Sequence, residues 1–184
     1  MVGKNSSKMT KEYKFDKKAV WKYLYKPIII TFSAHILTGL LITIISRNTD
    51  LGNVFIVFIT IIVIWAIIFM LPLLILYLNH RKLSKSTLFK VREDGTFTFE
   101  SALNSMQFSS EEITKVKLWL SPPSFDDRID FLYFGKYHFT TIYTEKNEPI
   151  NISCLVFDCT REVFTEKLIN KERKIFPLMG TNNR

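Results

Sequence analysis

Two long runs without a charged side chain limit what this chain can fold into. Residues 27–46 supply 20 positions and residues 54–78 supply 25, and neither run contains Asp, Glu, Lys or Arg. A bilayer core of roughly 30 Å needs about 20 such residues in a helix that rises 1.5 Å per residue. The rest of so short a chain could not cover two helices that are apolar on every side. The pattern therefore predicts two membrane-spanning helices.

Basic residues flank the predicted pair of helices on both sides. The net charge of +8 consists of +6 in residues 1–26, 0 in residues 27–80, +3 in residues 81–85 and −1 in residues 86–184. The linker "RNTDLGN" is short, so both outer ends of the pair face the same side of the membrane. Since basic flanks stay in the cytoplasm, the sequence predicts a multi-pass protein of the cytoplasmic (inner) membrane with both termini cytoplasmic.

The basic residues next to the predicted spans are candidates for contact with the lipid bilayer. Asp16 is typical of a helix N-cap, and Phe15 and Val20 fit a hydrophobic staple, so an amphipathic helix is expected to lead into the first span. Basic groups near anionic lipid contribute about 1 kcal/mol each, although the same residues could act only as topology signals. The predicted headgroup contacts are Lys18, Lys22, Lys26, Arg81, Lys82 and Lys85.

A stripe of small and polar residues runs along the first span. Thr31, His35 and Thr38 recur at helical spacing, and Gly39 lies beside them. Such a stripe is typical of the face that meets another transmembrane helix, so these four residues are predicted to pack the helix pair. His35 is the only ionisable residue in either run and could instead be a proton or ligand site. We favour packing, with a hydrogen bond across the pair, because no carboxylate lies in either run.

The period of the sequence changes to two after residue 86, which is typical of β-strands. Asp94-Gly95 between two alternating segments predicts a β-hairpin. Further strands are expected in "SMQFSS", from Lys115 to Leu120, and in "RIDFLYF", "HFTTIYT" and "INISCLVF". Apolar residues from Val163 to Ile169 recur at helical spacing and predict a C-terminal helix that ends before Pro177.

The expected organisation follows from these segments. Residues 1–15 form a flexible basic arm, residues 16–80 form the amphipathic leading helix and the two spans at 27–46 and 54–78, residues 86–176 form a cytoplasmic domain, and residues 177–184 form a tail. The fold class is a membrane α-helical hairpin joined to an α+β domain of about seven antiparallel strands.

The order of several segments resembles a known family. Five features follow one another along the chain: the aromatic stretch "YKFDKKAVW", the two-span hairpin, the strand pair around Asp94-Gly95, the polar step "FSSEEITKV" and the strand "INISCLVF" before "EVFTEKL". In this the chain resembles the YcxB-like and related bacterial membrane proteins that carry a PH-like domain. The resemblance implies a PH-like antiparallel β-barrel or sandwich closed by a C-terminal helix. The chain departs from the family in lacking a Trp near Phe108 and in its longer connection from Leu120 to Arg128.

The sequence contains no recognisable catalytic or metal-binding constellation. It has three His and two Cys, and the motifs HExxH, GxSxG and CxxC and a Gly-rich phosphate loop are absent. Cys154 and Cys159 are expected to be reduced structural thiols. A domain of nearly zero charge also argues against nucleic acid as a partner. We therefore expect no enzyme, no cofactor and no metal.

The loop "SPPSFDD" is the candidate partner-binding segment, through Pro122, Pro123, Phe125, Asp126 and Asp127. The favoured function is a non-enzymatic, membrane-anchored interaction protein. It would present its domain at the cytoplasmic face to an unidentified membrane or cytoplasmic protein, and it could form a homo-oligomer. One alternative is an immunity or self-protection protein against a membrane-acting toxin. Another is a small transporter or channel subunit that uses His35.

Overall fold

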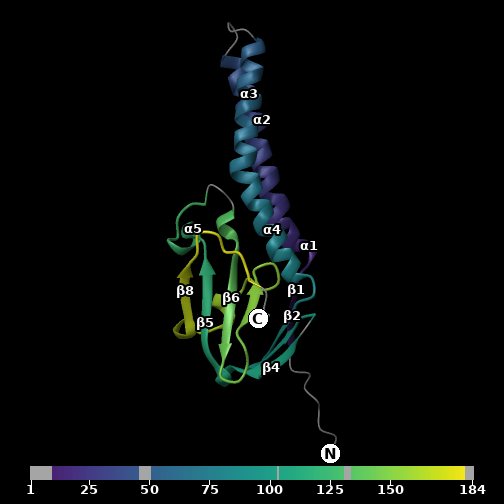
Figure 1. The fold of residues 1–184 in the computed structure, drawn as a ribbon, viewed down its shortest axis with the longest axis vertical. Helices are drawn as coiled ribbons and strands as arrows, with labels where there is room; N and C mark the ends of the chain where they lie inside the picture. The colour runs from purple at the N-terminus through teal and green to yellow at the C-terminus, as the bar shows by residue number, and fades with distance from the viewer. Residues whose placement is uncertain (1–9, 46–50, 103, 131–133, 181–184) are drawn as a thin grey trace, which may run out of the picture.

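A long helical hairpin stands on a β-rich domain (Figure 1). The computed structural model describes residues 10–45, 51–102, 104–130 and 134–180. The first helix of the hairpin consists of α1 (Lys17–Val20), the π-helix η1 (Trp21–Tyr25) and α2 (Lys26–Ile45). The second consists of α3 (Leu51–Trp65), the π-helix η2 (Ala66–Met70) and α4 (Leu71–Ser84).

Both helices of the hairpin are long and apolar enough to cross a membrane by length and composition. The qualifying segments are Lys17–Ile42 and Phe55–Ser84, and only 6% and 11% of their most apolar windows are buried inside the protein. Apolar side chains such as Phe32, Phe55 and Ile56 are each more than 60% exposed. These helices are therefore not buried in the core of the domain that the structure describes.

Each helix of the hairpin contains a π-helical turn just before a proline. The N–H of Lys26 donates to the carbonyl of Trp21, and the N–H of Leu71 donates to the carbonyl of Ala66. Pro27 and Pro72 follow one residue later, and proline has no N–H with which to continue the α-helical pattern. A π-helical turn accommodates the hydrogen bond that proline cannot donate, and the helix continues beyond it.

The first sheet has the order β1-β2-β3-β4 and is antiparallel throughout. Its strands are β1 (Thr10–Lys14), β2 (Leu88–Arg92), β3 (Thr96–Glu100) and β4 (Ser105–Ser109). The predicted hairpin at Asp94-Gly95 joins β2 to β3. Gly95 has a φ of 77°, a conformation that favours glycine.

The second sheet has the order β7-β6-β5-β8. Its strands are β5 (Ile113–Leu120), β6 (His138–Thr144), β7 (Ile150–Ser153) and β8 (Ile169–Arg173). The β5–β6 and β6–β7 pairs are antiparallel, whereas β8 runs parallel to β5. Short helical turns connect the strands: η3 (Ser110–Glu112), α5 (Pro122–Phe125), η4 (Phe134–Lys136), α6 (Thr160–Val163) and η5 (Glu166–Leu168).

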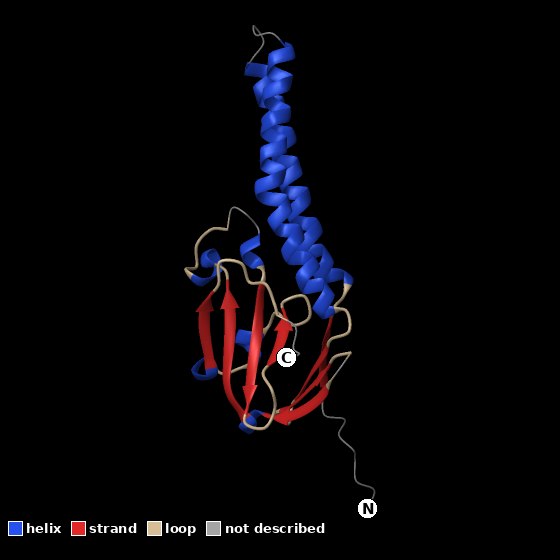
Figure 2. Cartoon of the chain, viewed as in Figure 1, coloured by secondary structure: helices blue, strands red, loops and turns tan. Residues whose placement is uncertain are grey.

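The two sheets enclose an aromatic core between them (Figure 2). Phe97 stacks on Phe108 with ring centroids 5.5 Å apart, and Phe157 meets the edge of Phe89 at 4.9 Å. The large aliphatic members Val116, Ile142 and Ile152 are fully buried in the same cluster. This core accounts for the alternation of apolar and polar residues in the strands.

Two sequence predictions for the fold of the domain differ from the structure. The expected C-terminal helix is only the four residues of α6 followed by η5 and strand β8, because parallel pairing with β5 overrides the helical spacing of Val163 to Ile169. Of the expected antiparallel barrel or sandwich, the described residues form two four-stranded sheets and no closed barrel, and one pair of strands, β5 and β8, is parallel.

The predicted arm at 1–15 and the strand at 128–134 also differ from the structure. Thr10–Lys14 form β1, which pairs with β2 along its whole length, while residues 1–9 lie outside the described residues. Of the strand predicted at 128–134, residues 128–130 are irregular, Phe134 begins η4, and 131–133 lie outside the described residues.

Candidate functional site: the junction of hairpin and domain

The base of the hairpin is part of a second hydrophobic core, which we name the junction core. Its buried members come from both helices and from the segments next to strands β6 and β7 of the second sheet: Tyr23, Leu73, Leu76, Tyr77, Tyr137, Cys154 and Leu155. Leu76 and Tyr137 are each 0% exposed. The hairpin is thus packed into the domain and is not attached through a free linker.

A buried hydrogen bond links Tyr137 of the domain to the first helix. The hydroxyl of Tyr137 donates to the carbonyl of Tyr23 at 2.7 Å, and the two rings lie 5.4 Å apart. In a regular α-helix the Tyr23 carbonyl would accept from residue 27, but Pro27 has no N–H. Tyr137 therefore satisfies a carbonyl that the proline leaves open, which an otherwise apolar core requires.

His80, two residues beyond the apolar run that ends at Leu78, is completely buried against the domain. Its Nε2 lies 2.9 Å from the Pro177 carbonyl and must donate to it, while its Nδ1 lies 2.8 Å from the Ser153 hydroxyl. That hydroxyl accepts from the N–H of Leu155 and keeps its own hydrogen for the Nδ1 of a neutral imidazole. Burial lowers the pKa of His80 to about 4, although the bond to Pro177 opposes the shift.

The C-terminal segment is fixed to the second helix beside His80. The side-chain amide of Asn79 donates to the Met179 carbonyl at 3.2 Å and accepts from the Met179 N–H at 2.9 Å. Residues 177–180 of the predicted tail therefore belong to the junction, whereas 181–184 lie outside the described residues. Helix α4 continues to Ser84, and β2 begins only four residues later at Leu88.

A cavity of about 600 Å³ opens beside the junction core, and we name it the junction pocket. Its floor is apolar, from Tyr23, Leu118 and Leu120. Its rim carries charges of both signs: the basic residues are Lys22, Arg128, Lys136 and Arg161, and the acidic ones are Asp127, Asp158 and Glu162. An apolar floor with a few polar groups is the usual form of a binding site.

An ion pair separates the junction pocket from a second cavity of about 310 Å³. Lys22, Tyr23 and Asp158 line both cavities, and the Lys22 ammonium bonds to the Asp158 carboxylate. Burial alone would raise the pKa of Asp158, but the bond and charge of Lys22 hold it below its usual value. Burial lowers the pKa of His138 in the junction pocket, so its imidazole is neutral near pH 7.

The predicted headgroup residues do not share one environment. Lys22 is engaged in the ion pair with Asp158, and Lys18 lines the second cavity. Arg81 is half-buried, with its guanidinium 5.9 Å from the centre of the Tyr77 ring. Three others are exposed on the hairpin base and just after it: Lys26, Lys82 and Lys85.

The predicted packing residues of the first span contact the second helix through two positions. The ring of His35 lies 3.9 Å from that of Trp65, and a Cβ on Gly39 would lie 2.5 Å from the Phe58 ring. The expected hydrogen bond from His35 across the pair is corrected by the structure, because its Nδ1 donates to the Thr31 carbonyl of its own helix at 2.8 Å. The hydroxyls of Thr31 and Thr38 likewise donate within that helix, to Pro27 and Ala34.

The predicted partner-binding loop forms α5 and the turn that follows. The hydroxyls of Ser121 and Ser124 both donate to the Gly135 carbonyl at 2.6 Å, which fixes α5 against η4. Of the predicted residues, Pro123 and Asp127 line the junction pocket, whereas Pro122 and Phe125 are half-buried. Asp127 has a φ of 51°, a left-handed conformation that Asp tolerates in turns.

Asp126 of the same loop is paired with two arginines. Its carboxylate lies 3.6 Å from Arg128 and 3.7 Å from Arg173.

No group of three or more His, Cys, Asp or Glu side chains that could hold a metal ion lies among the residues that the structure describes. Burial raises the pKa of Cys154 to about 12 and, together with the neighbouring Asp158, that of Cys159 to about 11.

Sequence reasoning did not find the residues that build the junction. Tyr23 and Tyr137 are separated by 114 positions, and His80 and Pro177 by 97. One local signal was available: Pro27 lies four residues after Tyr23, so the Tyr23 carbonyl needs a donor from outside the helix. Nothing in the sequence identifies Tyr137 as that donor.

The fold and the junction define a class of protein: a domain of two four-stranded sheets from which an apolar helical hairpin emerges. Comparison with protein families gives a match to the PH domain over residues 12–166, which is most of the chain. The protein therefore belongs to the PH domain family. No curated protein and no solved structure is similar enough to count as a match. The hairpin lies within the matched range, between β1 and β2.

Proposed function

We propose that this protein is a non-enzymatic interaction module of the cytoplasmic membrane, as its resemblance to the YcxB-like proteins implies. The hairpin spans the bilayer twice, both termini are cytoplasmic, and the PH-like domain is held at the membrane surface. There it binds a membrane or cytoplasmic protein. PH domains commonly act as modules that bind lipids or proteins, which agrees with this role.

The junction core is the observation that carries the proposal. Leu73, Leu76 and Tyr77 are buried in the domain, while Leu71, Leu74 and Leu78 on the same helix are about half exposed. A soluble domain gains nothing from extending an apolar helix pair far beyond its own core. A membrane protein needs that extension, and burying its base keeps the domain close to the bilayer.

The length of the free hairpin supports this role. Leu51 to Pro72, the part of the second helix before its burial in the domain, comprises 22 residues. At 1.5 Å per residue it is about 33 Å long, close to the roughly 30 Å of a hydrocarbon core. On the first helix Pro27 to Ile45 is about 28 Å long. The two prolines would thus mark the cytoplasmic boundary of the membrane.

The junction pocket is the proposed binding surface for the partner. It includes Pro123 and Asp127 of the loop singled out from the sequence, and it combines an apolar floor with charges of both signs. Such a surface suits an amphipathic protein segment that carries both acidic and basic side chains. The packing of His35 on Trp65 favours a structural role for this histidine over a role in transport.

Cysteine labelling in intact cells tests the proposal. In a Cys154→Ala, Cys159→Ser background, a cysteine at Asn48 between the two apolar runs should react with a membrane-impermeant maleimide. A cysteine at Lys146, exposed at the opposite end of the domain, should react only after the cells are lysed. Labelling of Lys146→Cys in intact cells would refute the cytoplasmic assignment.

Photocrosslinking tests the role of the pocket. A crosslinkable amino acid at Arg161, on the rim of the pocket, should capture a defined protein from native membranes. Closing the pocket floor with Leu118→Trp should abolish that product. The same crosslinker at Lys171, an exposed residue of the edge strand β8, is the matched control for surface capture. Identical products from both sites would refute the pocket as the binding surface.

A further inference from the structure

The exposed apolar residues of the domain gather at one end. Among the residues that the structure describes, the large apolar side chains that are exposed outside the hairpin are Ile129, Ile175 and Leu178. Ile129 is 76% exposed and Ile175 is 77% exposed, more than any lipid-facing residue of the hairpin itself. Single exposed apolar residues are ordinary on a protein surface, so the significance of these two isoleucines depends on where they lie.

Both isoleucines lie at the end of the second sheet from which the hairpin emerges. Strands β5 and β8 run parallel and finish together, with Leu120 opposite Arg173. The N–H of Lys174 donates to the Leu120 carbonyl at 2.8 Å, so Ile175 lies next to the end of β5. The pairing of Asp126 with both Arg128 and Arg173 holds the neighbourhoods of the two isoleucines together.

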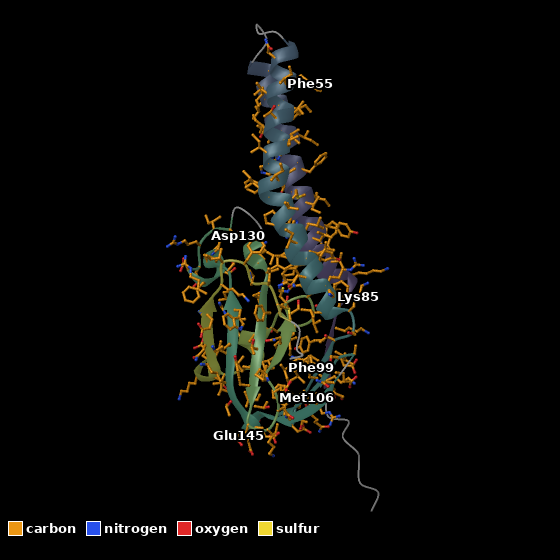
Figure 3. The ribbon with its side chains drawn as sticks, viewed as in Figure 1. Phe55, Lys85, Phe99, Met106, Asp130 and Glu145 are labelled. Atoms are coloured by element: carbon orange, nitrogen blue, oxygen red, sulfur yellow. The ribbon has the colours of Figure 1, made fainter. Side chains whose placement is uncertain are left out.

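This end of the domain faces along the hairpin toward its tip. In Figure 1 the arrowheads of β5 and β8 point toward the side where the hairpin leaves, and α5 lies at that end. Figure 3 shows Asp130, the neighbour of Ile129, beside the hairpin and nearer to its tip than Lys85. Glu145 lies at the opposite end of the domain in the same view.

The charges at this end are nearly balanced. Arg128, Lys136 and Arg173 are exposed, but Asp127 is exposed too and Asp126 pairs with both arginines. Attraction to anionic lipid is therefore not the main source of any contact made here. Apolar side chains among charges of both signs fit the interfacial layer of a bilayer, whether its lipids are zwitterionic or anionic.

We propose that the end of the domain formed by Ile129 and Ile175 is a membrane-contact surface that dips into the headgroup layer of the leaflet next to the domain. This rests on the proposed function, since the hairpin must span that bilayer. Because the junction core fixes the domain to the hairpin, this end has a set height relative to the membrane. The hairpin and the two isoleucines then form one continuous lipid contact.

Spin-label accessibility in nanodiscs tests the proposal on the full chain. In the Cys154→Ala, Cys159→Ser background, a nitroxide is attached at Ile129→Cys or Ile175→Cys. Controls carry the label at Ile59, an exposed residue in the middle of the hairpin, and at Lys146 at the far end of the domain. All four sites are solvent- or lipid-exposed, so the labels leave the packing intact. Collisions with dissolved oxygen report lipid, and collisions with a water-soluble nickel complex report water.

The two isoleucine sites are expected to collide with nickel several-fold less often than Lys146. They should also collide with oxygen more often than Lys146 does, with a collision rate between those measured at Lys146 and at Ile59. The result should be the same in phosphatidylcholine alone and with added phosphatidylglycerol. If Ile59 reports lipid while Ile129 and Ile175 match Lys146, the contact surface is refuted and the spanning hairpin stands. If Ile59 itself reports water, the proposed function fails first.

Discussion

Replacing Leu76 with Ala should destabilise the whole domain, although Leu76 belongs to the hairpin. Leu76 is 0% exposed and belongs to the junction core with side chains of the domain such as Tyr137, just before β6, and Leu155, just after β7. The substitution removes three carbon atoms at about 0.8 kcal/mol each, roughly 2.4 kcal/mol in all. The cavity left behind brings the expected loss to about 2–5 kcal/mol. This is a large part of the stability of an ordinary domain, about 5–15 kcal/mol.

Pulse proteolysis in urea, with the full chain in detergent micelles, measures this loss as the free energy of unfolding of the domain. The matched control is Leu78→Ala, the same change two positions away at a side chain that is 50% exposed. The control should change the free energy of unfolding by less than about 1 kcal/mol. If Leu76→Ala is as mild as Leu78→Ala, the hairpin base does not stabilise the domain and the junction core is wrong.

Three further predictions concern the same junction. Tyr137→Phe leaves the Tyr23 carbonyl without its donor and should cost about 1–3 kcal/mol in the same assay; an unchanged midpoint would argue against that bond. Because the pKa of His80 is lowered from 6.5 to about 4, the unfolded state binds a proton first as the pH falls. Stability should therefore decrease between about pH 6.5 and pH 4, by on the order of 3 kcal/mol in total. His80→Gln should remove most of this slope, and a slope as steep as that of wild type would assign it to other groups. With the pKa of Cys154 raised to about 12 and that of Cys159 to about 11, both thiols should alkylate at pH 8 at least about 100-fold more slowly than an exposed cysteine; rapid reaction of either would contradict its raised pKa.

The apolar hairpin and several strands could be predicted from local patterns. Uncharged runs of 20 and 25 residues leave few alternatives to long exposed helices, and Asp94-Gly95 is a strong turn signal. Strand His138–Thr144 coincides with the segment predicted for it, and Ile150–Ser153 is the first half of the strand predicted at 150–157. These features depend only on residues that are near one another in the chain.

Features that depend on distant pairing could not be predicted. Thr10–Lys14 is rich in lysine and is predicted to be part of a basic arm. It completes the first sheet by pairing with residues 88–92. Ile169–Arg173 is a strand only because β5 is beside it. Residues 81–85 lie between the predicted hairpin and the predicted domain, but α4 continues to Ser84 and Ser84 is buried. In each case a tertiary contact outweighs the local preference.

The candidate site shows the same division. The loop at 122–127 could be singled out from its prolines and acidic residues, but its neighbours could not. Lys22 comes from the first helix and Arg161 from α6, and they share a cavity with Asp127. Only the folded chain brings these charges to one rim, which is why no basic cluster was visible in the sequence.

The distance between the hairpin and the far end of the domain tests the central claim most directly, since the junction core should make the two parts one rigid body. Nitroxides at Ile64 and Glu145, both exposed, allow that distance to be measured by pulsed dipolar spectroscopy in nanodiscs. A reference pair at Lys167 and Glu145 lies wholly within the domain. We predict a single distance distribution for Ile64–Glu145 that is as narrow as that of the reference pair. A distribution several times broader, or one with several maxima, would show that the domain moves independently of the hairpin and would contradict the account.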